Sequence, residues 1–277
     1  MNKKVSIIIT AYNEKKNIKD CLLSLKEQDY QPLEILTADD GSTDGTYELI
    51  KSLGVACFRL SHQGTAKSRN YAAKKATGEI LVFLDADMHF EKNFITKLVE
   101  PINESRTKGT FSRLEYVSNW DKPLARCWNR NNNPPLPDKL RIPQDKEEGD
   151  DFRAILKSEF ERVGGFNNVG YTDTWTLSKK LGYKPINAPG AIYFHNNPET
   201  YSEVINSSQW IGKRQYRLGK IGSLIAIIRS FILFSLFKGI VKALKYKEAT
   251  FIPFQIIYDL GITAGAFRQF TLNEVKK

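Results

Sequence analysis

The sequence lacks the short motifs that mark several common classes of enzyme. Its 277 residues include 3 cysteines, Cys21, Cys57 and Cys127, which are scattered and form no Cys-x-x-Cys pair. We therefore expect reduced thiols of a cytosolic protein rather than a disulfide scaffold. There is no Gly-x-Gly-x-x-Gly and no Gly-x-x-x-x-Gly-Lys-Ser/Thr, which argues against a dinucleotide-binding Rossmann site and against a P-loop. The 3 histidines belong to no defensible Ser-His-Asp grouping.

Long apolar runs are also missing. The first run, Val5–Ile9, is shorter than the apolar region of a signal peptide and ends near Ala11, so no secretory signal is expected. Residues 223–244 are mostly Phe, Leu and Ile, but Arg229 and Lys238 interrupt them. No uncharged run approaches the ~20 residues that a membrane span needs. With 41% hydrophobic and 26% charged residues, the composition is that of an ordinary globular core.

The net charge of +10 is concentrated in one segment of the chain. Residues 201–247 contain nine lysines and arginines and one acid, Glu203, so this stretch carries +8. Residues 248–277 are neutral overall, and residues 1–200 carry the remaining +2. The basic character therefore belongs to the C-terminal part and needs its own explanation.

Apolar, β-branched runs alternate with helical periodicity over the first hundred residues. This alternation is typical of right-handed βαβ units and a parallel sheet. The apolar runs are continuous, as expected for strands covered on both faces. Strands are predicted near 5–10, 33–38, 55–60 and 79–84, and helices near 14–27, 43–53, 65–77 and 91–103.

The alternation ends near residue 105. We expect a strand at 109–117 and then a loop at 131–150, which is rich in Asn, Pro, Asp, Lys and Glu. A second compact stretch should run from Phe152 to about residue 197, and the basic C-terminal part should begin near residue 199.

Two acids follow the last of the predicted parallel strands. Asp85-Ala86-Asp87 come directly after the apolar residues 78–84, at the carboxyl edge where open parallel sheets bind ligands. Two carboxylates one residue apart repel each other, and burying them unpaired is expensive. A divalent cation would resolve the repulsion and could also bind a pyrophosphate. A solvated acidic turn is the alternative.

Other polar residues should lie at the same edge of the sheet. The first strand ends at residues 10–14, where Tyr12 can stack on a base. The second strand ends at residues 39–46, where Gly41 permits an unusual backbone angle. One aspartate is left there to accept hydrogen bonds from a ligand such as the imide of uracil. The guanidinium group of Arg69 can donate two hydrogen bonds to oxygens of a phosphate or a nucleobase. The alternatives without a ligand are that Tyr12 only packs against its neighbours, that residues 39–46 form a helix-capping turn, and that Arg69 is solvated.

Taken together, these motifs resemble those of family 2 glycosyltransferases of the GT-A fold. Four of them occur in the family's order and spacing, at residues 5–14, 39–46, 69–70 and 78–87. A second region resembles the family's acceptor-side signature, at residues 152–155 and 163–166, followed by Asp173.

The resemblance implies an α/β fold of the GT-A type. Its sheet would be Rossmann-like, mostly parallel and flanked by helices, with a C-terminal helical extension. The implied activity is inverting transfer of a sugar from a nucleotide-sugar to an acceptor hydroxyl, with a UDP-sugar favoured and a GDP-sugar left open. The expected domains are a catalytic domain, 1–198, with a nucleotide-binding half, 1–104, and an acceptor half, 105–198, and a basic amphipathic membrane-associating region, 199–277.

The resemblance also implies roles for individual residues. Asp173 would be the general base, and Asp39 would support the turn beside the nucleotide. Mn²⁺ or Mg²⁺ would neutralise charge on the departing diphosphate. Lys213 and Arg214 would reach the diphosphate when a C-terminal loop closes, although a solvated basic face explains them equally well. The nucleotide-binding residues would be Thr10, Ala11, Tyr12, Glu14, Asp40, Arg69, Asp85 and Ala86, and the metal ligands would be Asp85, Asp87 and His195.

The sequence departs from the family in two places. Many members carry Glu-Asp at the base, whereas this chain has Thr172-Asp173. The later Gln-x-x-Arg-Trp signature has only a loose echo at residues 209–216, so processive polymer synthesis is not supported. For His195 a hydrogen-bonded structural role is the alternative to metal binding.

The C-terminal segment has the pattern of a membrane-surface helix. Within residues 223–244 and just beyond, Ser235, Lys238, Lys242 and Lys245 share one helix face by their spacing, and the other positions are apolar. A basic amphipathic helix of this kind fits the plane of an anionic membrane surface. Residues 251–270 repeat the pattern. Helices packed on the catalytic domain or on a second subunit, or a single tilted span, are the alternatives.

We therefore expect a peripheral or monotopic protein at the cytoplasmic face of a membrane, attached in-plane through residues 220–270. Its partners would be the nucleotide-sugar donor, a lipid-linked or glycan acceptor of polysaccharide or glycolipid biosynthesis, and the anionic membrane surface. No nucleic-acid partner is expected, and a homodimer is left open. The alternative functions are a nucleotidyltransferase, which would need a basic loop near residues 12–14, and a non-catalytic relative that binds nucleotide-sugar or membrane.

Overall fold

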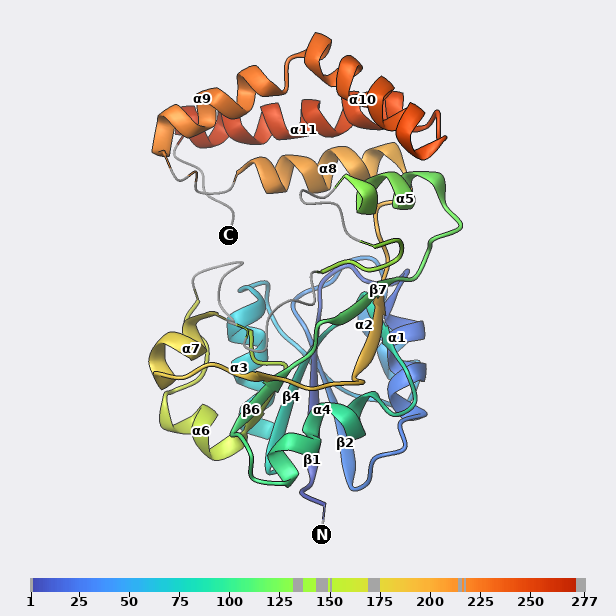
Figure 1. Cartoon of the computed structure of the whole chain (residues 1–277). Helices are drawn as coiled ribbons and strands as arrows, with labels where there is room; N and C mark the ends of the chain where they lie inside the picture. The colour runs from blue at the N-terminus through green and yellow to red at the C-terminus, as the bar shows by residue number, and fades with distance from the viewer. Residues whose placement is uncertain are drawn as a thin grey trace. The chain divides into compact units, whose positions relative to one another are not determined.

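The computed structural model describes residues 2–131, 137–142, 149, 151–168, 175–213, 216 and 218–272. Two compact units make up the chain (Figure 1). The α/β unit comprises residues 1–116 and 142–195, and the helical unit comprises residues 117–141 and 196–277. Each unit is therefore built from two separate segments.

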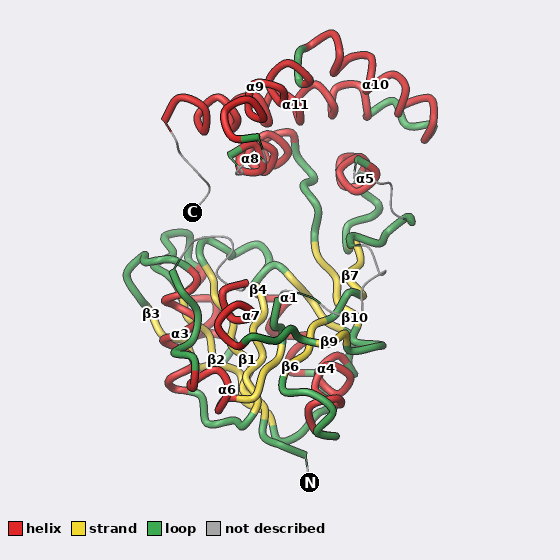
Figure 2. Tube along the Cα trace, turned by 60° about the vertical axis from the view of Figure 1, so that its left-hand side comes forward, coloured by secondary structure: helices red, strands yellow, loops and turns green. Residues whose placement is uncertain are grey.

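A seven-stranded sheet forms the centre of the α/β unit, in the order β3-β2-β1-β4-β8-β6-β9. β1 pairs in parallel with β2 and β4, and β2 with β3, whereas β8 is antiparallel to β4 and β6. The predicted mostly parallel sheet flanked by helices is confirmed (Figure 2). The strands are β1 (Val5–Ala11), β2 (Leu33–Asp39), β3 (Ala56–Arg59), β4 (Ile80–Asp85), β6 (Gly109–Phe111), β8 (Ala154–Leu156) and β9 (Ile186–Asn187).

Both faces of this sheet are buried because successive residues of its strands are apolar. In β1, Ile7 and Ile9 belong to a core shared with α1, α2 and α4, while Ile8 belongs to a core shared with α3, α6 and α7. All three isoleucines are 0% exposed, which explains the continuous apolar runs of the sequence. The helices are α1 (Ile18–Lys26), α2 (Thr46–Ser52), α3 (Thr65–Lys75), α4 (Phe94–Asn103), α6 (Lys157–Arg162) and α7 (Trp175–Leu181).

A second sheet has three strands, in the order β5 (Met88–Phe90), β10 (Ile192–His195) and β7 (Leu114–Val117). The prediction of one strand over residues 109–117 is wrong, because the chain leaves the large sheet after Phe111 and enters this small one at Leu114. Ser112 fixes the break. Its hydroxyl donates to the Ala191 carbonyl at 2.5 Å and accepts from the Leu114 amide at 3.1 Å.

Helices form nearly all of the regular structure described in the helical unit. They are α5 (Pro123–Arg130), α8 (Tyr201–Gly212), α9 (Gly219–Arg229), α10 (Ile232–Tyr246) and α11 (Phe251–Leu272), and α11 packs against the other four. The helix predicted over residues 223–244 is in fact two helices, which meet at Ser230–Phe231 at an angle of 63°. By length and composition, no single described helix would cross a bilayer, and the bent pair α9–α10 is the one combination that meets those criteria.

Close packing of α8 on α11 depends on small residues. A Cβ atom at Gly265 would lie 2.1 Å from the Gln209 carbonyl oxygen and 2.8 Å from the Gly212 Cα. One at Gly261 would lie 1.9 Å from the Ser208 hydroxyl. The two helix backbones therefore approach more closely than any larger residue would allow.

We expect Gly265→Ala to destabilise the helical unit. Alanine is the better helix former, but its Cβ would force the two backbones apart, and overpacking of this kind costs about 1–3 kcal/mol. Thermal unfolding followed by circular dichroism would measure the loss. Ala264→Ser, at the exposed neighbouring position, serves as the control. A Gly265→Ala midpoint equal to that of the control would contradict the packing argument.

Candidate active site

The carboxyl ends of three neighbouring strands bring the predicted residues together. In the parallel register of β1 and β4, Thr10 lies opposite Asp85, and in that of β1 and β2, Ala11 lies opposite Asp39. Ala86 is buried behind this edge. The predicted neighbourhood of residues 10–14, 39–40 and 85–87 is thus present at one edge of the sheet.

The two aspartates that end β2 have different surroundings. Asp40 is buried and accepts hydrogen bonds from the Ser68 hydroxyl at 2.8 Å and from the amides of Gln63 and Gly64 at 3.1 and 3.0 Å. Its carboxylate thereby anchors the loop that precedes α3. Asp39 is fully buried; one carboxylate oxygen accepts from the Ser42 amide at 3.2 Å. Its other oxygen, Oδ1, has no hydrogen-bond partner among the described residues.

An aromatic surface stands beside these aspartates. Tyr12 is 46% exposed, and its ring stacks on the imidazole of His62 with centroids 4.2 Å apart. The Nδ1 atom of His62 lies 2.9 Å from the Asp40 carboxylate. Gly41 permits this arrangement because its φ is +84° and a Cβ there would lie 3.0 Å from the His62 amide nitrogen.

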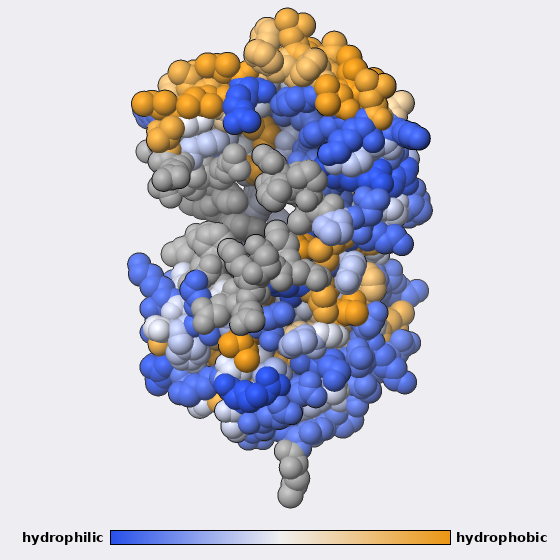
Figure 3. All heavy atoms as spheres, viewed as in Figure 1, coloured by the Kyte–Doolittle hydropathy of each residue, from blue (hydrophilic) through white to orange (hydrophobic). Residues whose placement is uncertain are grey.

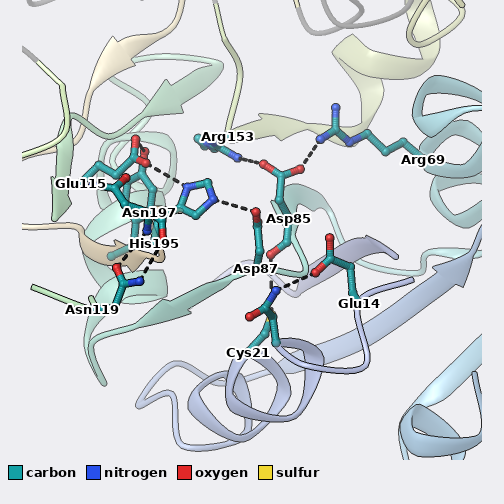
Figure 4. A network of polar contacts seen from close by, with 12 residues as sticks. Glu14, Cys21, Arg69, Asp85, Asp87, Glu115, Asn119, Arg153, His195 and Asn197 are labelled. Carbon is teal, nitrogen blue, oxygen red and sulfur yellow. Dashed lines mark hydrogen bonds and ion pairs between the residues drawn. The ribbon is translucent and has the colours of Figure 1, made fainter. Parts of the chain in front are cut away.

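Asp85 is held between two guanidinium groups (Figure 4). Arg69 of α3 donates to one carboxylate oxygen at 2.6 Å, and Arg153, just before β8, donates to the other at 3.1 Å. Burial by itself raises the pKa of Asp85, but Arg69 and Arg153 outweigh it and hold the pKa at about 2. The carboxylate is therefore ionised, and both of its oxygens are engaged.

Asp87 begins a chain of contacts that runs into the small sheet (Figure 4). Its Oδ2 lies 2.7 Å from His195 Nε2, and His195 Nδ1 lies 3.0 Å from Glu115 Oε1. The other oxygen of Glu115 accepts from the Tyr193 hydroxyl at 3.0 Å. Burial raises the pKa of Tyr193, and the neighbouring Glu115 carboxylate adds to the shift, so the phenol stays a donor. Glu115 therefore fixes the orientation of the imidazole that faces Asp87.

Glu14 is a further carboxylate at this edge. It accepts a hydrogen bond from the Asn17 amide group at 2.9 Å. Burial is the main cause that raises its pKa from 4.5 to about 7, and the charges of Asp87 and Asp85 add to the effect. Glu14 is therefore a partly buried carboxyl whose pKa lies near neutrality, at the edge of the sheet that Asp85 and Asp87 share.

The sequence also predicts Asp173, Lys213 and Arg214 as site residues. Asp173, the predicted base, and Arg214 fall outside the described residues. Lys213 belongs to the helical unit, at the C-cap of α8. The described residues contain no group of three or more His, Cys, Asp or Glu side chains that could hold a metal ion. Asp87 and His195 form a close carboxylate–imidazole pair at 2.7 Å, and the role of Asp85, Asp87 and His195 as metal ligands stays a prediction.

Three polar contacts of this edge were not predicted from the sequence. Arg153 lies inside the acceptor-side motif at residues 152–155, which was interpreted as a pattern without a role for the arginine. Glu115 is a buried acid within an otherwise apolar strand, and that contrast was the available signal. His62 gave no signal, because its contact with Tyr12 joins loops distant in the sequence.

The raised pKa of Glu14 predicts a pH-dependent stability. Between about pH 4.5 and 7 the folded protein binds the Glu14 proton more tightly than the unfolded chain does, so this group makes stability fall as pH rises through that window. Glu14→Gln removes the effect. The thermal midpoint of the variant should therefore gain on that of the parent as pH rises from 4.5 to 7 and then level off.

The control for this comparison is Glu27→Gln, an exposed position after α1, whose midpoint should track that of the parent at every pH. A constant offset between Glu14→Gln and the parent across the window would show that the carboxyl titrates as an exposed acid does.

Comparison with known sequences places the chain in a family. A sequence model described as Glycosyl transferase family 2 matches residues 6–164. The uncharacterized glycosyltransferase YfnE of Bacillus subtilis is 38% identical over 104 residues, which are 35% of this chain and 26% of YfnE. The Escherichia coli UDP-Glc:alpha-D-GlcNAc-diphosphoundecaprenol beta-1,3-glucosyltransferase WfaP is 37% identical over 111 residues, or 39% of this chain and 43% of WfaP. The chain thus spans less than half the length of either relative.

Solved structures match over nearly the whole chain. Staphylococcus aureus TarS 1–349 in complex with UDP-GlcNAc superposes with a TM-score of 0.59 at 16% identity and covers 96% of this chain and 92% of TarS 1–349. The mannosyltransferase PcManGT of Pyrobaculum calidifontis, in complex with GDP-Man and Mn²⁺, has a TM-score of 0.56 at 20% identity and covers 99% of this chain and 76% of PcManGT. These likenesses establish the GT-A fold. Because the family model matches more than half of the residues, the chain belongs to glycosyl transferase family 2.

Proposed function

We propose that the protein transfers a sugar from a nucleotide-sugar to an acceptor hydroxyl, with the help of a divalent cation and with inversion at the anomeric carbon. The observation that carries the proposal is the pairing of Asp87 with His195 beside the Asp85–arginine cluster. A nucleotide-sugar donor needs a binding place for its nucleobase, a binding place for its diphosphate, and a group that neutralises the negative charge of the diphosphate.

For the nucleobase of the donor, the structure favours a contact with Asp39 over the predicted contact with Asp40. Both oxygens of Asp40 already accept hydrogen bonds from the loop before α3 and from Ser68 of α3, whereas Asp39 Oδ1 is buried and has no partner among the described residues. An unsatisfied buried acceptor is costly, and an imide N–H would relieve it. We therefore assign Asp39 to the imide of the base and Asp40 to the support of the pocket. Tyr12 supplies the stacking surface, and His62 must shift or join the stack when a base enters.

For the diphosphate and cation, Asp87 and His195 are the preferred protein ligands. Both oxygens of Asp85 already accept from arginines, whereas Asp87 and His195 face each other at 2.7 Å. One carboxylate oxygen and one imidazole nitrogen suit Mn²⁺, and the diphosphate with water would complete the coordination. The bound cation would supply charge neutralisation as the diphosphate leaves. Arg69 and Arg153 hold Asp85 ionised, and in this role Asp85 can accept from a ribose hydroxyl.

The proposed base, Asp173, comes from the family resemblance. It would take the proton of the acceptor hydroxyl on the face of the sugar opposite the leaving diphosphate, which gives inversion. It lies two residues before α7 (Trp175–Leu181) in the chain.

Relatives guide the choice of substrates. Structures of TarS contain UDP or UDP-GlcNAc, and that of PcManGT contains GDP-Man. We therefore keep UDP-sugars and GDP-sugars as candidate donors and favour UDP, which occurs in more of the similar structures. WfaP acts on a sugar linked to diphosphoundecaprenol. We propose a UDP-sugar donor and a lipid-linked acceptor, which places the reaction at a membrane surface, and we favour the cytoplasmic face.

The donor assignment predicts Mn²⁺-dependent release of UDP from one member of a panel of UDP- and GDP-sugars. Asp87→Ala should lower this release by about 100-fold or more, because loss of metal-assisted charge neutralisation costs several kcal/mol. The exposed acid Glu27, changed to alanine, provides the matched control. Full activity of Asp87→Ala would remove the metal assignment. Release of pyrophosphate from UTP and a sugar 1-phosphate, with no release of UDP from the sugar panel, would favour the nucleotidyltransferase alternative.

The base assignment predicts a separation of binding from turnover. Asp173→Asn should bind UDP in calorimetry with the affinity of the parent but transfer sugar about 10²–10⁴-fold more slowly, since positioned general bases contribute rate factors of that size. Normal transfer by Asp173→Asn would show that the proton goes to another group. Loss of UDP binding as well would show that Asp173 serves the donor.

A further inference from the structure

The helical unit exposes a continuous apolar surface along α9 and α10 (Figure 3). On α10 the side chains of Leu233, Phe234, Phe237 and Leu244 are 67, 56, 67 and 75% exposed. Between residues 221 and 244, where every residue is described, the charged residues are Arg229, which is exposed, and Lys238 and Lys242, which are partly buried. The other exposed residues of that stretch are Ile221, Leu224, Ile225, Ile228, Phe231, Ile232, Leu233, Phe234, Leu236, Phe237, Ile240, Val241 and Leu244.

The polar side of the same two helices faces inward. Lys238 Nζ lies 2.5 Å from the Asp259 carboxylate of α11, and Lys242 Nζ donates to Gln255 of α11 at 3.1 Å. On α9, the buried Ser223 hydroxyl bonds Gln269 of α11. We call these three contacts the inner polar seam.

The seam corrects the interpretation of the lysine face made from the sequence. Lys238 and Lys242 were expected to face anionic lipid, but the structure directs both toward α11. Burial and the neighbouring Lys238 lower the pKa of Lys242 from 10.5 to about 8, as expected for an amine withdrawn from water. Packing the polar stripe against α11 leaves the apolar stripes of α9 and α10 outermost.

The charged side chains at the two ends and at the bend of this surface indicate what covers it. Lys220 at the start of α9, Arg229 at the bend, and Lys245 and Lys247 at the end of α10 are exposed, and no exposed acid lies between residues 218 and 247. Interfaces between protein chains carry a polar rim of both signs and hydrogen bonds. An almost wholly apolar face with cationic ends instead matches hydrocarbon bordered by lipid phosphates.

We propose that α9 and α10 insert this apolar face into one leaflet of a lipid bilayer, with the inner polar seam kept on α11 and the basic side chains at the headgroups. Insertion is driven by apolar burial more than by anionic charge. The bend at Ser230–Phe231 allows both helices to stay packed on α11 while their apolar sides share one surface. This attachment is independent of the donor chemistry proposed above.

Flotation of the full-length chain with vesicles tests the proposal. The parent should float with vesicles of phosphatidylcholine alone, and added phosphatidylglycerol should strengthen binding by a smaller factor that high salt removes. The double variant Phe234→Ser/Phe237→Ser should lower the partition coefficient at least about tenfold, because each buried aromatic side chain contributes that much or more. Leu23→Ser, an apolar residue of α1 that is 39% exposed, should leave binding unchanged.

The double variant lies on exposed helix positions, so its fold and its release of UDP should match those of the parent. Phe237→Trp gives a second readout. After the signal of the 4 native tryptophans is subtracted with the parent, acyl-chain bromolipids should quench the added fluorescence of Phe237→Trp more than that of Leu23→Trp. Equal flotation of parent and double variant would overturn the proposal. So would a dimer in lipid-free buffer that the double variant dissociates, accompanied by no flotation, because a second copy would then cover the face.

Discussion

The rest of the α/β unit depends on how the repulsion between Asp85 and Asp87, at the end of β4, is compensated. A strand that is apolar up to its last residue brings Asp85 and Asp87 to the carboxyl edge of the sheet, where two like charges one residue apart must each find a partner. Arg69 and Arg153 neutralise Asp85, while His195, oriented by Glu115, faces Asp87. These partners come from α3, the residue before β8, β7 and β10, so the order of both sheets is tied to this pair of carboxylates.

The order of the strands determines which elements supply the partners of Asp85 and Asp87. The antiparallel strand β8 lies directly beside β4, which brings Arg153 to Asp85. The small sheet pairs β5 with β10, which sets His195 opposite Met88, next to Asp87 in the chain. The chain departs from a regular parallel sheet at the strands that supply these side chains. We infer that the irregular half of the unit exists to complete the site that the regular half begins.

The sequence was sufficient for the regular half. Continuous apolar runs specify strands buried on both faces, and the motifs that follow them specify the shared edge. It was insufficient where a contact joins distant residues, as with Glu115 and His195, because spacing carries no information on such pairs. It also misjudged residues 109–117, where Ser112 bonds the Ala191 carbonyl and turns the chain into the other sheet. In α10, periodicity grouped Ser235, Lys238, Lys242 and Lys245 on one face but could not show that Asp259 and Gln255 would draw Lys238 and Lys242 inward while Lys245 stays exposed.

Crystals grown with Mn²⁺ and UDP offer the most direct test of the proposed chemistry. An anomalous difference map recorded at the manganese absorption edge should show a peak at coordination distance from both the Asp87 carboxylate and His195 Nε2, beside the diphosphate. With UDP bound, a peak that contacts neither residue, or an empty map at this position, would contradict the account.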